Sequence, residues 1–314
     1  MQWKRTFIGL AFSFFFVVSY FTNKFVLTVM KFNYPTLFQG WQTFIGAALL
    51  LLSGKLGWVE MRRISRSAAL SWFPGSLLFV GNIYAGSRAL SRLEIPFFLT
   101  LQNSSHVVSY VISKAVHREK MEWLKFISVC LMLFSAINLP AYDPQFDMSG
   151  YMWAVAHLIC VGTYRVFQFH YKSSNLSDIE QQYVNYLFSV LLLAMAAHPT
   201  GDLTSALEFP SLQSYAFSCG CCASALLGFF LLLASVKLKS GLSLQHFALW
   251  IFLSKVTAMF LSPLIFYMDL NTPSIICVAV SHVSEAVLVY FERETHQKRN
   301  QKEKNRDGPT TCTS

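Results

Sequence analysis

Apolar segments long enough to cross a lipid bilayer recur along this chain, and they restrict its fold more than any other feature. A helix needs roughly 20 apolar residues to span the hydrocarbon core. Ten segments approach that length and are joined by short connections: 7–30, 36–53, 68–86, 95–113, 121–139, 150–170, 182–198, 214–236, 242–267 and 273–291. The sequence therefore predicts an all-α integral membrane protein with ten transmembrane helices.

The composition agrees with a membrane protein. Hydrophobic residues make up 54% of the chain and charged residues only 13%, whereas soluble domains carry about 25% charged residues. The seven cysteines lack the paired spacing of zinc ligands, so we expect small buried hydrophobes, with no metal and no cofactor. The first segment is too long for the apolar region of a signal peptide, which indicates a retained span.

Basic residues are distributed unequally between the two sides of the predicted membrane. With the N-terminus in the cytosol, most of the 25 Lys and Arg residues fall on the cytosolic side, and the last three opposite loops carry only acidic charges. This positive-inside pattern predicts that both termini are cytosolic, which requires an even number of spans. The basic segment 292–314 is expected to be a disordered cytosolic tail near anionic lipid, and the net charge of +9 does not indicate nucleic acid.

Residues 1–291 form the predicted transmembrane domain. Ten spans divide into two five-helix halves, approximately 1–139 and 150–291. A half with an odd number of spans that occurs twice has to be inverted, which is a common transporter design. The two halves show no clear sequence match, so this repeat is predicted from the count alone.

Lys255 lies near the middle of the apolar run ALWIFLSKVTAMFLSPLIFY (248–267). A charged side chain at mid-bilayer costs about 2.5–3.5 kcal/mol on insertion scales, so it usually faces a cavity or a partner. Lys255 is too far from either end of its helix to reach water easily by snorkelling. We interpret it as a cavity residue, with Ser254 beside it.

Other polar residues also interrupt the apolar segments. The fourth segment carries a run of five near its centre: Gln102, Asn103, Ser104, Ser105 and His106. Consecutive residues point all around a helix, so these side chains either contact a ligand or form interhelical hydrogen bonds. The seventh segment has one helical face with the polar residues Gln181, Gln182, Asn185 and Ser189, flanked by Tyr183 and Tyr186. This face either binds a nucleobase or belongs to an aromatic belt at the membrane interface.

The remaining charges within the segments have two readings each. Lys24 lies toward the luminal end of the first segment, where it either snorkels or faces a site, and snorkelling is favoured for Arg165. Glu285 is deeper, with His282 one turn before it. We expect Glu285 to pair across helices, and proton chemistry is the alternative.

Short loops leave little room for a soluble catalytic domain, so function is expected inside the bundle. One hypothesis is a carrier for an anionic, partly aromatic solute held by a few fixed cations. The alternatives are an integral membrane transferase and a non-transporting scaffold. Asp143 and Asp147 share a loop, but no phosphate-binding glycine loop, zinc pattern or nucleophile elbow occurs. The carrier explains Lys255 best, and we expect no enzyme activity.

Several strings of residues resemble nucleotide-sugar transporters, especially the GDP-mannose transporter branch, in the same order along roughly residues 10–290. They are FTNKFVL (21–27), FNYPTLFQGWQ (32–42), SRALSRLEIPFFLTLQNSS (87–105), GYMWAVAHLICVGTYRVF (150–167) and SDIEQQYVNY (177–186). The resemblance implies a ten-helix drug/metabolite transporter fold in Golgi or endoplasmic-reticulum membranes. It also implies exchange of cytosolic nucleotide sugar for luminal nucleoside monophosphate.

Two family motifs can be carried over to this chain. The base-binding Phe-Tyr-Asn-Asn falls on residues 183–186, and the Gly-Ala-Leu-Asn-Lys near the sugar and phosphates falls on residues 251–255. The lysine is kept as Lys255, but only one of the two asparagines of the first motif is present, and the glycine and asparagine of the second motif are Ile251 and Ser254. The lysine of the family's fourth span is Gln102 here. These departures favour a UDP-sugar such as UDP-N-acetylglucosamine, with GDP-mannose or another GDP-sugar as the alternative.

The resemblance and the residues together predict a substrate site. Lys255, with Lys24 as a second cation, is expected at the diphosphate, and Tyr183, Asn185 and Tyr186 at the base. Gln102, Asn103 and Ser254 are expected at the sugar or ribose. The expected partners are a nucleotide sugar, a nucleoside monophosphate and membrane lipid. A homodimer is compatible with the sequence, and no nucleic acid is expected.

Overall fold

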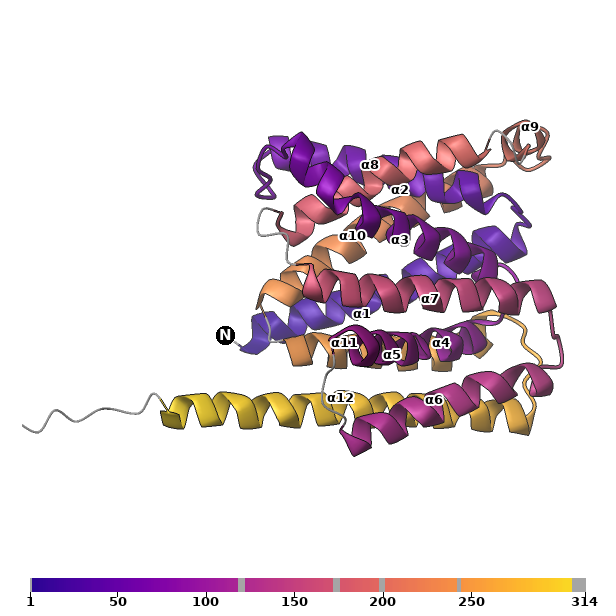
Figure 1. The fold of residues 1–314 in the computed structure, drawn as a ribbon. Helices are drawn as coiled ribbons and strands as arrows, with labels where there is room; N and C mark the ends of the chain where they lie inside the picture. Colours follow the sequence, from indigo (N-terminus) through magenta and orange to yellow (C-terminus); the bar gives the residue numbers. More distant parts are fainter. Residues whose placement is uncertain (1, 118–121, 172–175, 198–200, 242–243, 307–314) are drawn as a thin grey trace, which may run out of the picture.

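The computed structural model describes residues 2–117, 122–171, 176–197, 201–241 and 244–306, and these residues form helices and connecting loops without a strand. Figure 1 shows the long helices running side by side. Their bounds are α1 (Gln2–Lys24), continued by a π-helical turn (Phe25–Val29), α2 (Pro35–Lys55), α3 (Arg66–Leu90), α4 (Ile95–Asn103), α5 (Ser105–His117), α6 (Trp123–Tyr142), α7 (Met148–His170), α8 (Asp178–Ala197), α9 (Asp202–Leu207), α10 (Tyr215–Gly241), α11 (Leu244–Ile265) and α12 (Thr272–Arg306).

Six of these helical segments are long and apolar enough to cross a membrane. They are Arg5–Val29, Pro35–Lys55, Trp123–Tyr142, Tyr215–Ser240, His246–Ile265 and Thr272–Glu294. The chain is therefore an all-helical, multi-pass membrane protein. Each of the other four predicted segments also overlaps a helix, namely α3, α4 with α5, α7 and α8.

Two predicted boundaries differ from the structure. The fourth segment is divided at Ser104 into α4 and α5, within the run of consecutive polar residues. The expected tail of residues 292–314 begins inside α12, which continues to Arg306. This part of the chain is rich in Glu, Lys, Gln and Arg, which are favourable helix formers. Residues 307–314 lie outside the described residues.

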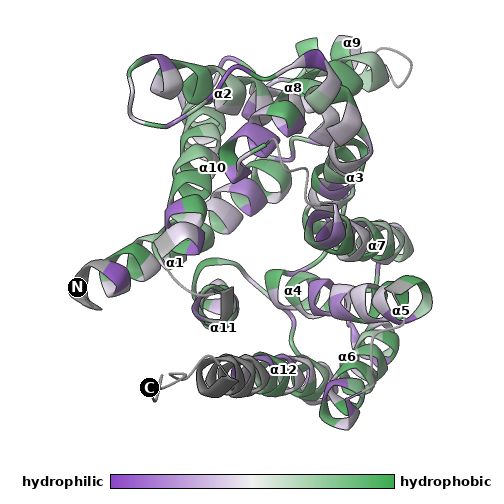
Figure 2. Ribbon diagram, turned by 60° about the vertical axis from the view of Figure 1, so that its left-hand side comes forward, coloured by the Kyte–Doolittle hydropathy of each residue, from purple (hydrophilic) through white to green (hydrophobic). Residues whose placement is uncertain are grey.

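Large hydrophobic side chains cover the outside of the bundle, while small polar ones lie inside it. Phe134 and Leu264 are 63% and 79% exposed, whereas Ser76 and Ser189 are fully buried. In Figure 2 the helices α2, α7 and α10 are mainly coloured as hydrophobic. An apolar outer surface suits lipid, and buried serines allow hydrogen bonds between helices that pack closely.

The closest helix pairs are α3 with α7, α6 with α12, α2 with α8, and α1 with α10. Figure 1 shows α6 and α12 together at one edge and α2 and α8 at the other. The helices α1, α3, α4, α7, α10 and α11 lie between these edges, and residues of all six line the internal cavity described next.

Candidate functional site

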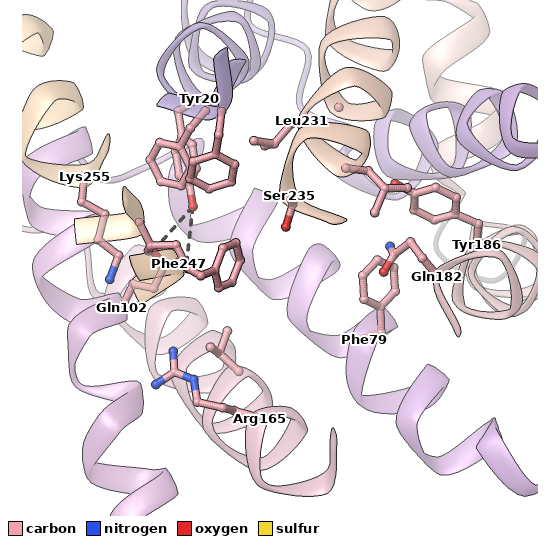
Figure 3. Close-up of a pocket in the computed structure, with 16 residues that line it drawn as sticks. Tyr20, Phe79, Gln102, Arg165, Gln182, Tyr186, Leu231, Ser235, Phe247 and Lys255 are labelled. Carbon is pink, nitrogen blue, oxygen red and sulfur yellow. Dashed lines mark hydrogen bonds between the residues drawn. The ribbon is translucent and has the colours of Figure 1, made fainter. Parts of the chain in front are cut away.

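Two cavities lie inside the bundle. The larger, about 390 Å³, is lined by residues of α1, α3, α4, α7, α8, α10 and α11, and its charged lining residues are Lys255 and Arg165. We call it the basic cavity (Figure 3). The smaller, about 280 Å³, has no Asp, Glu, Lys or Arg in its lining and is called the amide cavity after its side-chain amides: Asn23, Gln39, Gln42, Asn82 and Gln102.

A shared wall separates the two cavities. Tyr20, Phe79, Gln102 and Tyr186 line both of them, together with Gly228 and Leu231 of α10. The cavities are therefore two adjacent chambers, and these side chains lie at their boundary. Along α1, the basic cavity contacts residues nearer the N-terminus than the amide cavity does. A single elongated solute can reach from one chamber toward the other only past this boundary.

Hydrogen bonds fix the orientation of Gln102 in this wall. His157 donates from Nδ1 to the backbone oxygen of Asn82 at 2.9 Å, so its Nε2 is an acceptor in the neutral ring. Gln102 therefore donates from Nε2 to His157 at 3.2 Å. Its Oε1 is left to accept from the Tyr20 hydroxyl at 3.5 Å. The wall thus presents an amide and a phenol next to each other, and the dashed lines of Figure 3 mark the contacts between Tyr20 and Gln102.

Lys255 is held at the edge of the basic cavity by two acceptors. Its Nζ lies 2.6 Å from Glu285 Oε1 on α12 and 2.8 Å from Asn103 Oδ1 on α4. Lys255 is only 5% exposed, so it does not snorkel to the membrane surface. The expected pairing of Glu285 across helices is confirmed. Asn103 does not line the cavity; it positions Lys255 and donates from Nδ2 to Ser281 Oγ at 3.4 Å.

Arg165 supplies the second cation of the basic cavity. Its guanidinium donates to His106 Nδ1 at 3.0 Å and lines the cavity from α7. In Figure 3, Arg165, Gln102 and Lys255 lie on one side of the cavity and Gln182 and Tyr186 on the other. Arg165 lines the cavity but is also an exposed residue, so the favoured interpretation of Arg165 as a snorkelling residue stays a prediction.

The amide and phenol residues of α8 point in different directions. Tyr186 lines both cavities, and Gly46 of α2 leaves room for its ring, since a Cβ there would lie 2.6 Å from a ring carbon. Asn185 is fully buried and lines neither cavity. Its Oδ1 accepts from Trp72 and Ser76 on α3, both at 3.0 Å. Tyr183 is half-buried and also lies outside both cavity linings.

Lys24 and Ser254 are engaged in bonds between or within helices. Lys24 is 2% exposed and donates to the backbone oxygens of Leu90 at 3.2 Å and Leu93 at 2.8 Å, where α3 ends. The Ser254 hydroxyl lies within hydrogen-bonding distance of Ser13 Oγ on α1, at 2.8 Å, and of the backbone oxygen of Trp250 on its own helix, at 2.7 Å. Neither residue lines either cavity. Of the eight candidate site residues, the structure brings Lys255, Gln102 and Tyr186 to the cavities, with Asn103 directly behind Lys255.

Sequence reasoning missed the amides of the second span. Gln39 and Gln42 line the amide cavity, where Gln39 donates to Ser87 and Gln42 donates to Asn23 at 3.0 Å. Their signal is visible in the sequence as two amides three residues apart inside an apolar segment. Among the described residues, no group of three His, Cys, Asp or Glu side chains could hold a metal ion.

The fold and the cavities define a class of protein, a multi-pass membrane protein with an internal cavity lined by two cations. A solved structure described as "Crystal structure of protein" shares this fold, with a TM-score of 0.58, 15% identity, and 93% of this chain and 98% of that one covered. No protein-family model matches the chain.

Curated relatives place the chain within this class. It is 55% identical over 293 residues to "UDP-N-acetylglucosamine transporter TMEM241 homolog" of Xenopus laevis, covering 93% of this chain and 99% of that protein. It is 49% identical over 295 residues to the Mus musculus TMEM241 transporter, covering 94% and 99%. A GDP-mannose transporter of Aspergillus oryzae is more distant, at 26% identity over 84% of this chain and 74% of its own length. The chain belongs to the nucleotide-sugar transporter family, in the TMEM241 group, and is a transporter and not an enzyme.

Proposed function

We propose that this protein carries UDP-N-acetylglucosamine across a membrane in exchange for a nucleoside monophosphate. The observation that carries the proposal is the basic cavity, in which Lys255 and Arg165 line one chamber whose other walls are mainly aromatic and aliphatic. Relatives with 55% and 49% identity are named as transporters of this nucleotide sugar, which supports the substrate. The departures from the GDP-mannose motifs support the same choice.

The cations suit the diphosphate of a nucleotide sugar. Each phosphate carries a negative charge, and an ammonium and a guanidinium can each donate charge-assisted hydrogen bonds to it. Arg165 takes the place that sequence reasoning gave to Lys24, whose ammonium is occupied by the backbone oxygens of Leu90 and Leu93. Two cations rather than many are appropriate, because a carrier has to release its solute as well as bind it.

The remaining lining supports a placement of the two ends of the solute. Tyr186 and Phe79 offer ring faces and Gln182 an amide, which suits a nucleobase at one side of the basic cavity. Gln102 faces both chambers and leads to the amide cavity. Side-chain amides there retain hydrogen-bonding capacity for the hydroxyl and acetamido groups of the sugar. Asn185, Tyr183 and Ser254 would then support the site from the helix interfaces behind it.

The helix contacts support ten spans in two inverted halves. Exchanging the halves maps α1 onto α7, α2 onto α8, α3 onto α10, α4 with α5 onto α11, and α6 onto α12. Under this exchange the contact of α3 with α7 becomes that of α10 with α1, and α3 with α8 becomes α10 with α2. The pairs α2–α8 and α6–α12 map onto themselves. Such a pattern is expected of an inverted repeat with its site between the halves.

The same proposal includes location and orientation. The positive-inside pattern favours cytosolic termini, and the family resemblance favours the Golgi membrane, with the endoplasmic reticulum as the alternative. In this orientation the basic cavity lies toward the cytosol, because it contacts the N-terminal side of α1. A homodimer stays a prediction of the sequence.

Counterflow uptake tests this function. Proteoliposomes containing the full chain are preloaded with UMP or GMP and offered a panel of labelled nucleotide sugars. We expect uptake of UDP-N-acetylglucosamine that is stimulated by internal UMP. Stimulation of GDP-mannose uptake by GMP would favour the second candidate, and no trans-stimulation by either monophosphate would overturn exchange. Lys255→Met should abolish uptake, whereas Lys237→Met, an exposed lysine near the end of α10, should leave it unchanged.

A further inference from the structure

Two buried polar atoms next to the basic cavity have no hydrogen-bond partner among the described residues. They are Oε2 of Glu285 and Nε2 of His282, and the two residues are 2% and 4% exposed. His282 donates from Nδ1 to the backbone oxygen of Val278 at 2.9 Å, so its Nε2 is the acceptor of a neutral ring. A buried acceptor without a donor is costly, and here two of them lie one turn apart on α12.

The charges around the basic cavity do not balance a diphosphate. Without substrate, Glu285 neutralises Lys255 across their 2.6 Å contact. When a diphosphate with one charge on each phosphate enters, Lys255 and Arg165 balance it only if the carboxylate charge of Glu285 is removed. Lys255 and Glu285 are only 5% and 2% exposed, so leaving the Glu285 carboxylate without its counter-charge beside a diphosphate is unfavourable.

We propose that Glu285 is a proton-binding site that takes up a proton when the nucleotide sugar binds. This inference rests on the proposed function and adds a proton to it. The contact between Lys255 Nζ and Glu285 Oε1 breaks, and Nζ donates instead to a phosphate oxygen. The proton comes from hydronium or buffer acid in the solvent and forms an O–H bond on the Glu285 carboxyl, and the conjugate base of the buffer stays in solution. When the substrate leaves, the carboxyl returns the proton to water and pairs with Lys255 again.

The groups that face Glu285 support this exchange of partners. From α11 the facing charge is Lys255, and from α4 the facing group is the neutral Asn103. Arg165 on α7 interacts with Glu285 at longer range, and on α12 itself the neighbour is His282. On α6, Lys125 lies 3.8 Å from Glu292, further along α12. Lys255 is thus the close counter-charge of Glu285, and its transfer to a phosphate leaves the carboxylate unpaired.

Protonation of Glu285 also provides for the two unpaired atoms, which are not hydrogen-bonded to each other in this structure and pair once the two side chains turn toward one another. A carboxyl group has an O–H donor that a carboxylate lacks, and His282 offers the free acceptor three residues earlier on the same helix. Residues three apart on a helix are neighbours on its surface, so the added proton gives Glu285 a local partner in place of Lys255.

Calorimetry of the full chain in detergent measures the proton directly. UDP-N-acetylglucosamine is titrated at one pH in buffers of different ionisation enthalpy, and the slope of heat against that enthalpy gives the protons taken up. This ligand is chosen because its phosphates do not titrate near neutral pH, unlike a monophosphate, whose second pKa is about 6. We expect uptake approaching about one proton per bound ligand, with affinity falling by up to about tenfold per unit of rising pH.

Three variants separate this inference from the function on which it rests. Glu285→Gln should bind UDP-N-acetylglucosamine without taking up a proton. Glu292 is another carboxyl on α12, and the control variant Glu292→Gln should take up the proton as the wild-type protein does. His282→Gln should retain most of the proton uptake on ligand binding. Wild-type binding with equal heat in every buffer and no pH dependence would overturn the inference alone, as would proton uptake retained in Glu285→Gln. If Glu285→Gln does not fold, the slope of binding heat against buffer ionisation enthalpy for the wild-type protein still tests the inference. Absence of any UDP-N-acetylglucosamine binding would overturn the proposed function itself.

Discussion

Replacing Lys255 by Met separates its part in stability from its part in binding. The substitution keeps a long apolar stem but removes the ammonium that lies 2.6 Å from Glu285 Oε1. The side chains of this pair are 6% and 3% exposed, so solvent screens it little. Breaking a buried ion pair by removing one partner costs about 3–5 kcal/mol. Lys255→Met should therefore lower the free energy of unfolding by that amount and abolish uptake.

The double variant Lys255→Met with Glu285→Gln tests the reason for this loss. Removing both charges leaves no unpaired carboxylate, and such replacements are often close to neutral. The loss of the bond to Asn103 should still cost about 1–3 kcal/mol, because its buried oxygen loses a donor. We therefore expect partial recovery of stability without recovery of uptake.

Thermal unfolding in detergent, with and without ligand, is the assay. At a ligand concentration of 100 times Kd, binding should stabilise the wild-type protein by about 2.7 kcal/mol. The ligand should stabilise neither variant, because each lacks the phosphate-binding cation. A double variant that is stabilised and transports like the wild-type protein would refute the assignment of Lys255 to the phosphates. A single variant with unchanged stability would refute the energetic argument for the pair.

Three further predictions concern other parts of the chain. Arg165→Gln should raise the KM for UDP-N-acetylglucosamine by about tenfold or more, since a hydrogen bond to a charged group contributes about 1.5–3 kcal/mol. An unchanged KM in counterflow assays would show that Arg165 does not belong to the site. Gly228→Trp should block uptake at little cost in thermal stability, because Gly228 lines both cavities and a Cβ there meets no atom within 4 Å; undiminished uptake would contradict it. Asp147→Ala should cost about 1 kcal/mol at neutral pH, since Asp147 caps α7 and binds Arg92 at 2.8 Å. The hydrogen bond from Arg92 holds the pKa of Asp147 below its usual value. The stabilisation by Asp147 is therefore fully present above the usual Asp pKa and is lost as the pH falls through the lowered pKa of Asp147 in the folded protein. Equal melting curves of Asp147→Ala and the wild-type protein at pH 7 would contradict this prediction.

The arrangement of helices along the chain was largely predictable, because apolar length is a local property of the sequence. Each predicted segment overlaps a helix, and the break at Ser104 falls in the run of polar residues that made the fourth segment unusual. That Glu285 would need a partner was also predictable, because a charge inside a bilayer is costly. Which partner it has depends on the packing of α11 against α12.

The inward faces of the helices were harder to predict. The helices α10 and α11 are apolar on nearly all sides, so periodicity does not show which residues face a cavity. Arg165 lies near a helix end, which favours snorkelling, and its place in the cavity lining and its bond to His106 depend on how α7 packs against α5. Asn185 illustrates the converse, since a polar residue in an apolar span can be fully satisfied by a neighbouring helix.

An experimental structure of the full chain with bound UDP-N-acetylglucosamine would test the central claim most directly. The quantity to measure is the distance from the diphosphate oxygens to Lys255 Nζ and to the Arg165 guanidinium. We predict that both cations lie within hydrogen-bonding distance of these oxygens, about 2.7–2.9 Å, and that Lys255 has left Glu285. A diphosphate bound elsewhere, with the contact between Lys255 and Glu285 still at 2.6 Å, would contradict the account.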